Sequence, residues 1–366
     1  MITALSVKGY RSVRDLWLEL GPLNVLVGPN GCGKSNLYRA VYLLHAAAMG
    51  TLARALAEEG GMPSVLWAGP RKRHDTRRLE LEVQLTGGFS YTLEAGLPEA
   101  NDLPAGHGFH NVPEQFFKLD PMVKAETVRF EGSSLLERGK SGVSLRDDSG
   151  KRVSLPMSLT RSESVLTQIA EPHRYPYLVS LRDTLTRWRF YHQFRTDEGA
   201  PLRQPQVGTF TPALAHDGRD LAAACATILE LGEGERLFQS IRRGLSGAEL
   251  RIGYDSEQAR FRVQLQIPGL LRPLEATELS DGTLRFLCLV AALLSPRLPP
   301  LLALNEPETS LHPELIEPLA ELIVAASSRS QLWIVTHSTT LAEAIERHSG
   351  AAAVCLALRE GETMLA

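Results

Sequence analysis

Nine residues near the amino terminus have the types and spacing that phosphate binding requires. The segment GPNGCGKSN at 28–36 matches the pattern G-x-x-x-x-G-K-[ST] and lies between an apolar run and residues of helical periodicity. Glycines let the backbone approach an anion closely, so that N–H groups and a helix N-terminus face phosphate oxygens. Lys34 would then bridge the β and γ phosphates, and Ser35 would ligate magnesium. We therefore predict a nucleotide site at Gly28, Pro29, Asn30, Gly31, Cys32, Gly33, Lys34, Ser35 and Asn36.

The segment LSDGTLRFLCLVAALL at 279–294 is a second candidate anion site. Ser280 and Gly282 stand at the start of an apolar helix, whose first N–H groups can face a phosphate, and the Ser280 hydroxyl can donate a hydrogen bond. Taken alone, this pattern is also typical of an ordinary helix cap. Its place directly before an acid-bearing strand favours the functional interpretation.

That strand is the apolar run LLALN at 301–305, and the acids Glu306 and Glu308 follow it. A carboxylate at the carboxyl edge of a strand, facing a phosphate loop, can orient or deprotonate an attacking water, and we predict this role for Glu306. His337 follows the next strand-like run, QLWIVT, and would hydrogen-bond the γ phosphate. A single histidine at a strand end is more often structural, so its role depends on the other motifs.

The elements that must position these residues follow from periodicity. Apolar residues at helical spacing predict a helix from Lys34 to about Gly50. Segments 79–85, 89–96 and 127–132 have strand character and predict an antiparallel layer, with loops at 97–125 and 139–152.

Helical patterns at 158–188 and 220–231 lead into a last third in which helices and strands alternate, as in a parallel α/β layer. We expect one compact head with an N-terminal lobe at 1–157, a helical or mixed middle region at 158–272 and a C-terminal lobe at 273–366.

Composition limits the class of protein. A net charge of −3 and a pI near 6.4 give no overall basic footprint for nucleic acid. The four cysteines are scattered without a CxxC pair, as expected of reduced thiols in a cytoplasm. No signal peptide pattern opens the chain, and the best apolar run, Leu287 to Leu294, is far shorter than the roughly 20 residues of a membrane span. We expect a cytoplasmic protein that does not contact the membrane.

The order of these motifs resembles that of ABC-type ATPases, in particular the soluble branch that includes RecF, SMC heads and the OLD-family ATPases. The likeness rests on ALSVKGYRSVRDLWLEL followed by LNVLVGPNGCGKSN, and on LSDGT in place of LSGGQ. It covers roughly 1–50 and 275–340. The resemblance implies a P-loop α/β fold with an antiparallel β layer and a helical lobe, and it implies ATP and Mg²⁺ as cofactors.

In such families the signature segment contacts the nucleotide held by the other subunit. The resemblance therefore implies a homodimer, in which two ATP molecules are sandwiched between the phosphate loop of one copy and Ser280 and Gly282 of its mate. By the same likeness, PETSLHP at 307–313 would lie along the dimer seam.

Asn305 departs from the family pattern, in which the strand ends in Asp-Glu. Asparagine keeps an acceptor oxygen of the same reach but loses the charge, so magnesium binding should weaken. Glu306 and Lys34 carry the transition-state chemistry and are present. We therefore predict slow ATP hydrolysis rather than none. A glutamine that contacts the metal is also expected between the two halves; Gln168 is our choice, Gln193 is the rival, and either could be an ordinary surface residue.

The segment RKRHDTRR at 71–78, with Arg71, Lys72 and Arg73, could contact DNA phosphates, although a solvated hairpin tip is the simpler interpretation. Residues 338–366 follow His337 and are too few for the nuclease domain that OLD-family proteins often carry, so we expect a stand-alone ATPase head.

By family analogy we expect an ATP-driven dimeric switch that acts on DNA or controls a separately encoded effector such as a nuclease, in genome maintenance or phage defence. One alternative is a nucleotide-binding clamp with little or no hydrolysis. Another is the nucleotide-binding subunit of a transporter, which the long region between Ser35 and Ser280 and the LSDGT sequence disfavour.

Overall fold

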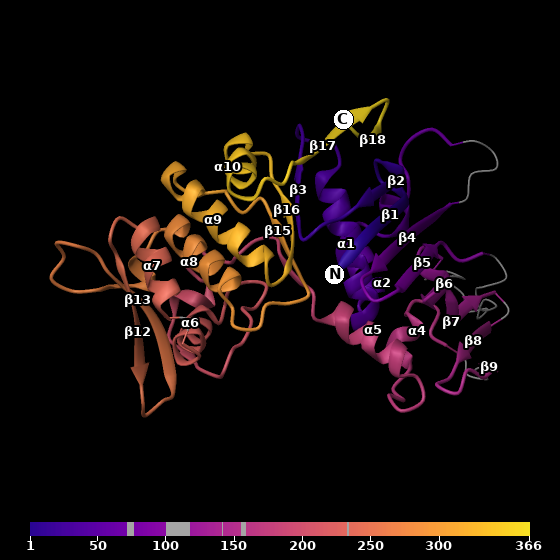
Figure 1. Cartoon of the computed structure of the whole chain (residues 1–366), viewed down its shortest axis with the longest axis horizontal. Helices are drawn as coiled ribbons and strands as arrows, with labels where there is room; N and C mark the ends of the chain where they lie inside the picture. The colour runs from indigo at the N-terminus through magenta and orange to yellow at the C-terminus, as the bar shows by residue number, and fades with distance from the viewer. Residues whose placement is uncertain (72–76, 100–117, 141, 155–158, 233) are drawn as a thin grey trace, which may run out of the picture. The chain divides into compact units, whose positions relative to one another are not determined.

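The computed structural model describes residues 1–71, 77–99, 118–140, 142–154, 159–232 and 234–366 (Figure 1). The described chain forms two compact units. Unit 1 comprises residues 1–21, 28–188 and 355–366, and unit 2 comprises residues 22–27 and 189–354. Lys72 and Arg73, which the sequence suggested as DNA contacts, lie outside the described residues.

Unit 1 is built on an eight-stranded antiparallel sheet in the order β2-β1-β4-β5-β6-β7-β8-β9. Alternation of buried and half-buried side chains along β4 shows why these sequences form strands with one face in a core. The sheet comprises β1 (Ile2–Tyr10), β2 (Val13–Glu19), β4 (Arg78–Leu85), β5 (Phe89–Gly96), β6 (Met122–Phe130), β7 (Ser133–Gly139), β8 (Gly142–Arg146) and β9 (Arg152–Ser154).

Helix α1 (Lys34–Met49) packs against this sheet, and it begins and ends where the sequence predicts. Gly50 ends it in the left-handed conformation, which favours glycine. The shorter helices of the unit are α2 (Leu52–Glu58), α3 (Met62–Val65), α4 (Val165–Gln168) and α5 (Pro176–Thr186). The helical patterns expected at 158–188 correspond to α4 and α5, which are separated by residues without regular structure.

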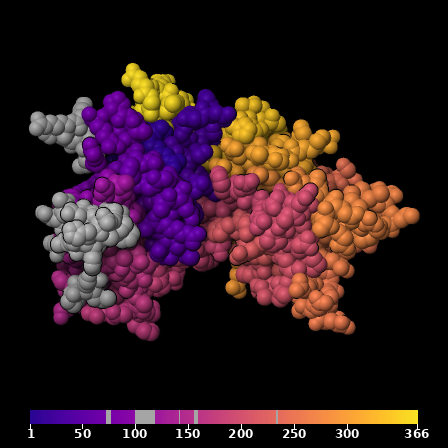
Figure 2. All heavy atoms as spheres, turned by 180° about the vertical axis from the view of Figure 1, so that it is seen from behind, coloured from indigo at the N-terminus to yellow at the C-terminus, as the bar shows by residue number. Residues whose placement is uncertain are grey.

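The loop expected at 139–152 is also wrong, since β8 and β9 extend the sheet there. These strands are short and mostly polar, so they carry little of the apolar alternation from which strands are predicted. The hairpin of β17 (Val354–Arg359) and β18 (Glu362–Leu365) closes the chain, and β18 lies against β2. Figure 2 shows this hairpin, in yellow, on the surface beside the indigo N-terminal strands.

Unit 2 is built on a parallel sheet in the order β10-β15-β16-β3, formed by β10 (Arg189–Tyr191), β15 (Leu301–Asn305), β16 (Gln331–Val335) and β3 (Leu23–Val27). Every residue of β15 and β16 is buried, as expected of strands covered on both faces. The helices of the unit are α6 (Leu221–Glu230), α7 (Gly234–Gly244), α8 (Asp281–Leu293), α9 (Ile316–Ser327) and α10 (Thr339–Ser349). Leucines of α8 and α9 dominate the core beneath them.

A small antiparallel sheet completes unit 2, with β13 between β11 and β12 and with β14 also paired to β13. Its strands are β11 (Gln206–Val207), β12 (Glu249–Asp255), β13 (Arg260–Gln266) and β14 (Leu274–Glu275), and short 3-10 turns lie at η2 (Pro201–Arg203), η3 (Ala276–Glu278) and η4 (Pro313–Leu315). Among the described residues, none of the helices combines the length and apolarity that a bilayer crossing requires.

Candidate functional site

The phosphate loop of unit 1 depends on glycines at Gly28 and Gly33. Both have positive φ, at +154° and +102°, where other residues are strained. A Cβ at Gly28 would also overlap the carbonyl oxygen of Leu356, and a Cβ at Gly33 would overlap the Thr363 hydroxyl. The loop therefore packs directly on the closing hairpin β17–β18, at contacts that only glycine permits.

The N-terminus of α1 is open to a ligand. Its cap residue Gly33 offers no side-chain hydrogen bond, so the first N–H groups of the helix have no side-chain acceptor. Lys34 is only 5% exposed, and its ammonium donates to the carbonyls of Gly28 at 2.5 Å and Pro29 at 3.0 Å. A bound phosphate would therefore interact both with the helix N-terminus and with the buried ammonium of Lys34.

Among the remaining predicted residues of the loop, some are exposed and others lie beneath the loop or stabilise it through hydrogen bonds. Pro29, Asn30, Gly31 and Ser35 are exposed, and Cys32 is buried below the loop. The Asn36 amide donates to the Ser12 hydroxyl at 2.8 Å, and Ser12 shares a 2.7 Å hydrogen bond with Thr363. Sequence reasoning missed Ser12 and Thr363 as supports, because no local pattern links positions so far apart in the chain.

The carboxyl ends of the parallel strands of unit 2 meet at one edge. Leu26 pairs with Val335, Val335 pairs with Asn305, and Tyr191 pairs with Leu304. This edge is where α/β sheets bind their ligands. The phosphate loop leaves from the same edge, because Gly28 directly follows Val27 in the chain.

Glu306 and His337 come together at this edge. The Nδ1 atom of His337 lies 3.6 Å from Oε1 of Glu306, and both side chains are partly exposed. Glu306 has a positive φ of +48°, a conformation that costs a non-glycine residue about 1–2 kcal/mol. Its carbonyl accepts a 2.9 Å hydrogen bond from the Arg285 guanidinium of α8. Surrounding contacts thus hold the carboxylate in a strained position, as is frequent at catalytic sites.

The residues present fit a magnesium ion. Asn305 is only 6% exposed, and its Oδ1 has no hydrogen-bond partner in the described part of the chain. A buried acceptor without a donor costs about 1–3 kcal/mol, which a metal-bound water would relieve. In unit 1, the Ser35 hydroxyl is exposed, and oxygen donors of this kind are what Mg²⁺ prefers.

The signature turn at the start of α8 is held by Arg203, which sequence reasoning missed. Its buried guanidinium donates to the carbonyls of Ala276 at 2.9 Å and Leu279 at 2.8 Å, and to the Asp281 carboxylate at 2.7 Å. Ser280 caps α8, with its hydroxyl accepting from the N–H of Thr283 at 3.2 Å.

Gly282 packs against the segment 307–313. A Cβ at this position would lie 2.5 Å from the carbonyl oxygen of Ser310. A groove of about 1080 Å³ opens beside the signature turn, between the turn, residues 244–248 at and after the end of α7, and residues 310–315. The predicted signature and seam segments therefore share one surface of unit 2.

The two candidate glutamines have different surroundings. Gln168 ends α4 in unit 1, where its side-chain oxygen Oε1 accepts from the Thr160 N–H at 3.3 Å. Gln193 is exposed two residues after β10, on the carboxyl edge of the parallel sheet that also carries Asn305. The metal-contacting role of Gln168 stays a prediction, and its rival lies on the ligand-binding edge.

These elements define a P-loop ATPase of the ABC type: a phosphate loop before a helix, a carboxyl-edge acid with a histidine, and a glycine turn that opens the signature helix. The chain belongs to the family described as "AAA domain, putative AbiEii toxin, Type IV TA system", whose model matches residues 23–102 and 137–343, more than half of the chain.

Other comparisons agree with this class. An OLD nuclease from Thermus scotoductus is 48% identical over 44 residues, which are 12% of this chain and only 8% of that protein. An SMC head bound to the C-winged helix domain of ScpA aligns with a TM-score of 0.52 at 15% identity, over 100% of this chain and 97% of that one. An SMC head domain with an extended coiled coil, bound to the C-terminal domain of ScpA derived from Pyrococcus furiosus, gives 0.51 at 12% identity, over 100% and 95%. At these identities the structural likeness shows the fold alone, and it confirms the predicted fold class.

Proposed function

We propose that this chain binds and hydrolyses ATP and works as a homodimeric switch. The observation that carries the proposal is the set of groups at the carboxyl edge of the unit 2 sheet: the Glu306–His337 pair and the buried oxygen of Asn305, which has no hydrogen-bond partner among the described residues.

In this proposal Lys34 and the N-terminus of α1 bind the β and γ phosphates. Ser35 and Asn305 would hold Mg²⁺, which supplies charge neutralisation of the phosphates when bound. Glu306 orients the attacking water and accepts its proton, and His337 donates a hydrogen bond to the γ phosphate. We place Gln193 rather than Gln168 beside the metal, because Gln193 follows a strand of this edge.

The test is phosphate release from ATP with and without magnesium, compared with Glu306→Gln and Lys34→Ala. Hydrolysis that needs magnesium and falls in both variants supports the proposal. Glu306→Gln should still bind ATP, whereas Lys34→Ala should not. Turnover equal to that of Glu306→Gln would instead favour the non-hydrolysing clamp, which the uncharged Asn305 makes the second candidate.

The dimer is proposed from the shared surface of the signature turn and segment 307–313. Each copy's LSDGT turn would cover the nucleotide in the other copy. Ser280→Arg places a bulky cation at the exposed cap of α8 and should abolish ATP-dependent dimerisation, measured by light scattering in the Glu306→Gln background. Dimers that form normally in this variant would reject the sandwich arrangement.

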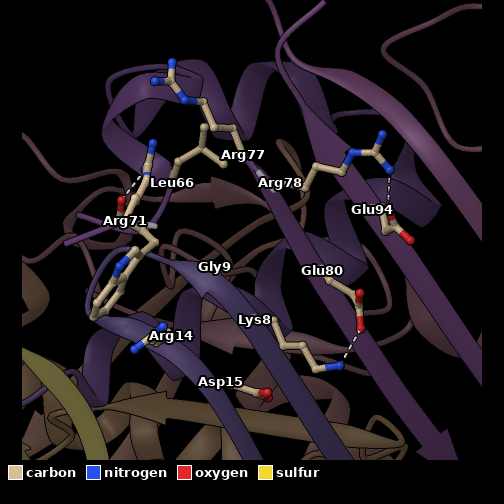
Figure 3. A pocket seen from close by; sticks show the side chains of 11 residues that line it. Lys8, Gly9, Arg14, Asp15, Leu66, Arg71, Arg77, Arg78, Glu80 and Glu94 are labelled. Carbon is tan, nitrogen blue, oxygen red and sulfur yellow. Dashed lines mark hydrogen bonds and ion pairs between the residues drawn. The ribbon is translucent and has the colours of Figure 1, made fainter. Parts of the chain in front are cut away.

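We also propose that unit 1 binds nucleic acid through a basic groove. A groove of about 480 Å³ carries basic side chains from β1, β2, β4 and the segment 66–71 (Figure 3). Two of its cations are neutralised, since Lys8 pairs with Glu80 at 3.0 Å and Arg78 pairs with Glu94 at 2.9 Å. The lining residues are Lys8, Gly9, Arg14, Asp15, Leu66, Trp67, Arg71, Arg77, Arg78, Glu80 and Glu94.

Arg14 and Arg77 are exposed and form no ion pair with another described residue, so their charges are available to phosphates. Arg14→Glu and Arg77→Glu should weaken DNA binding, and each should reduce the slope of affinity against salt by about 1. Arg152→Glu, an exposed arginine on β9, is the matched control. An equal loss of DNA affinity in the control would mean that binding depends on overall charge rather than on the groove. Unchanged DNA affinity in the groove variants would reject the proposed nucleic-acid site.

An effector protein under control of the switch, such as a separately encoded nuclease, remains our proposal by family analogy.

A further inference from the structure

Glu308 is a buried acid that the catalytic scheme above does not use. It is 8% exposed, and one of its oxygens, Oε2, has no hydrogen-bond partner in the described residues. Its other oxygen accepts a 2.5 Å hydrogen bond from the hydroxyl of Thr336, which is completely buried. Burying a carboxylate with so few hydrogen-bond donors costs folding free energy, which makes Glu308 a candidate for a functional role.

Thr336 links Glu308 to the backbone on both sides of His337. Its hydroxyl donates to Glu308 and accepts from the N–H of Ser338 at 2.9 Å, while its own N–H donates to the Leu26 carbonyl at 3.1 Å. Ser338 in turn caps α10 by accepting from the Leu341 N–H at 3.2 Å. The residues that flank His337 are therefore fixed by one hydroxyl and one carboxylate.

The histidine ring itself lies between two acids. Its Nδ1 atom is 3.6 Å from Oε1 of Glu308 and 3.6 Å from Oε1 of Glu306. Glu306 is partly exposed and belongs to the reaction, whereas the Glu308 side chain is buried and belongs to the segment 307–313. The ring thus has one partly exposed acidic neighbour and one buried acidic neighbour.

We propose that Glu308 is a positioning residue, which sets the orientation of His337 through Thr336 and couples the segment 307–313 to that histidine. This inference rests on the proposed ATPase function. A movement of the segment, as on pairing with a second copy, is transmitted to His337 through the buried hydrogen bond of Glu308 with Thr336 and through the direct approach of Glu308 to the ring. A purely structural role for Glu308 would instead affect stability without moving the ring.

Thr336→Val removes the hydroxyl at nearly constant shape, Thr336→Ser keeps it, and Glu308→Ala removes the acceptor. We expect Thr336→Val and Glu308→Ala each to lower kcat roughly 10- to 100-fold with the KM for ATP nearly unchanged, because a small misplacement of a catalytic group has that effect. Thr336→Ser should retain activity. The double variant should be no slower than the slower single variant, since both changes break one link. Glu343→Gln, an exposed acid on α10, is the control.

A second measurement does not depend on turnover. The imidazole ¹⁵N resonances of His337, assigned by comparison with His337→Gln, should shift in Thr336→Val and return in Thr336→Ser. An unshifted resonance, or losses of kcat that multiply in the double variant, would overturn the positioning role. Absence of hydrolysis by the wild-type protein would overturn the proposed function instead, and the resonances would still decide the role of Glu308.

Discussion

Arg203→Ala should loosen the signature turn, together with the loop at 196–197 whose carbonyls also accept from this guanidinium. Arg203 is buried and hydrogen-bonds the carbonyls of Ala276 and Leu279, both of them at buried positions. Hydrogen bonds from a charged donor contribute about 1.5–3 kcal/mol each, and the truncation removes two of them. The Ala276 carbonyl keeps its 3.4 Å hydrogen bond from the Leu279 N–H, whereas the buried Leu279 carbonyl loses the guanidinium donor. The expected loss is therefore about 3–5 kcal/mol of local stability.

The assay is hydrogen exchange of the amides at 276–284, followed by mass spectrometry. A loss of about 3–5 kcal/mol raises local opening by roughly 10²- to 4 × 10³-fold, since 1.4 kcal/mol is a factor of ten. Arg195→Ala is the matched control, because this arginine lies in the same loop but is exposed and contacts the exposed Asp197 and the Gly199 carbonyl rather than the turn. Unchanged exchange at 276–284 in Arg203→Ala would refute the assignment of Arg203 as the anchor of the turn.

Three further outcomes follow from the same contacts. Gly33→Ala should abolish binding of a fluorescent ATP analogue, because the added Cβ overlaps the Thr363 hydroxyl. Gly31→Ala, with open space at its Cβ, should weaken binding less. Equal losses of affinity in the two variants would contradict the role of the Gly33 contact. Asn305→Asp should strengthen magnesium-dependent thermal stabilisation by ATP, because it adds a charge beside the proposed metal, and an unchanged magnesium response would place the ion elsewhere. Burial raises the pKa of Glu126, so the pKa of this carboxyl is higher in the folded than in the unfolded chain. The contribution of Glu126 to folding stability is therefore fully present below the unfolded pKa. It is lost as pH rises through the folded pKa, because the carboxyl must then ionise while buried. Glu126→Gln should therefore gain stability relative to wild type as pH rises above about 4.3, the ordinary pKa of a glutamate in an unfolded chain, measured by urea unfolding. A difference that stays constant with pH would refute the shift.

Local chemistry explains what could be predicted along the chain. The start of α1 at Lys34 follows from a glycine-rich turn and helical periodicity, both of which act within a few residues. The alternation in β4 and β5 likewise predicted those strands. Polar strands such as β8 and β9 could not be predicted, because their pairing is decided by neighbouring strands in the sheet rather than by their own sequence.

The sequence by itself determined the family, the phosphate loop and the order of the candidate acids. Each of these is recognised from the types of residues that stand next to one another in the chain. Only the tertiary structure decided which residues support them. Thr363 shapes the loop from near the end of the chain, Arg203 holds the turn at Ser280, and Thr336 joins Glu308 to the backbone around His337. Each of these contacts joins residues that are distant in sequence. Their geometry is set by sheet register and helix packing, which no local pattern encodes.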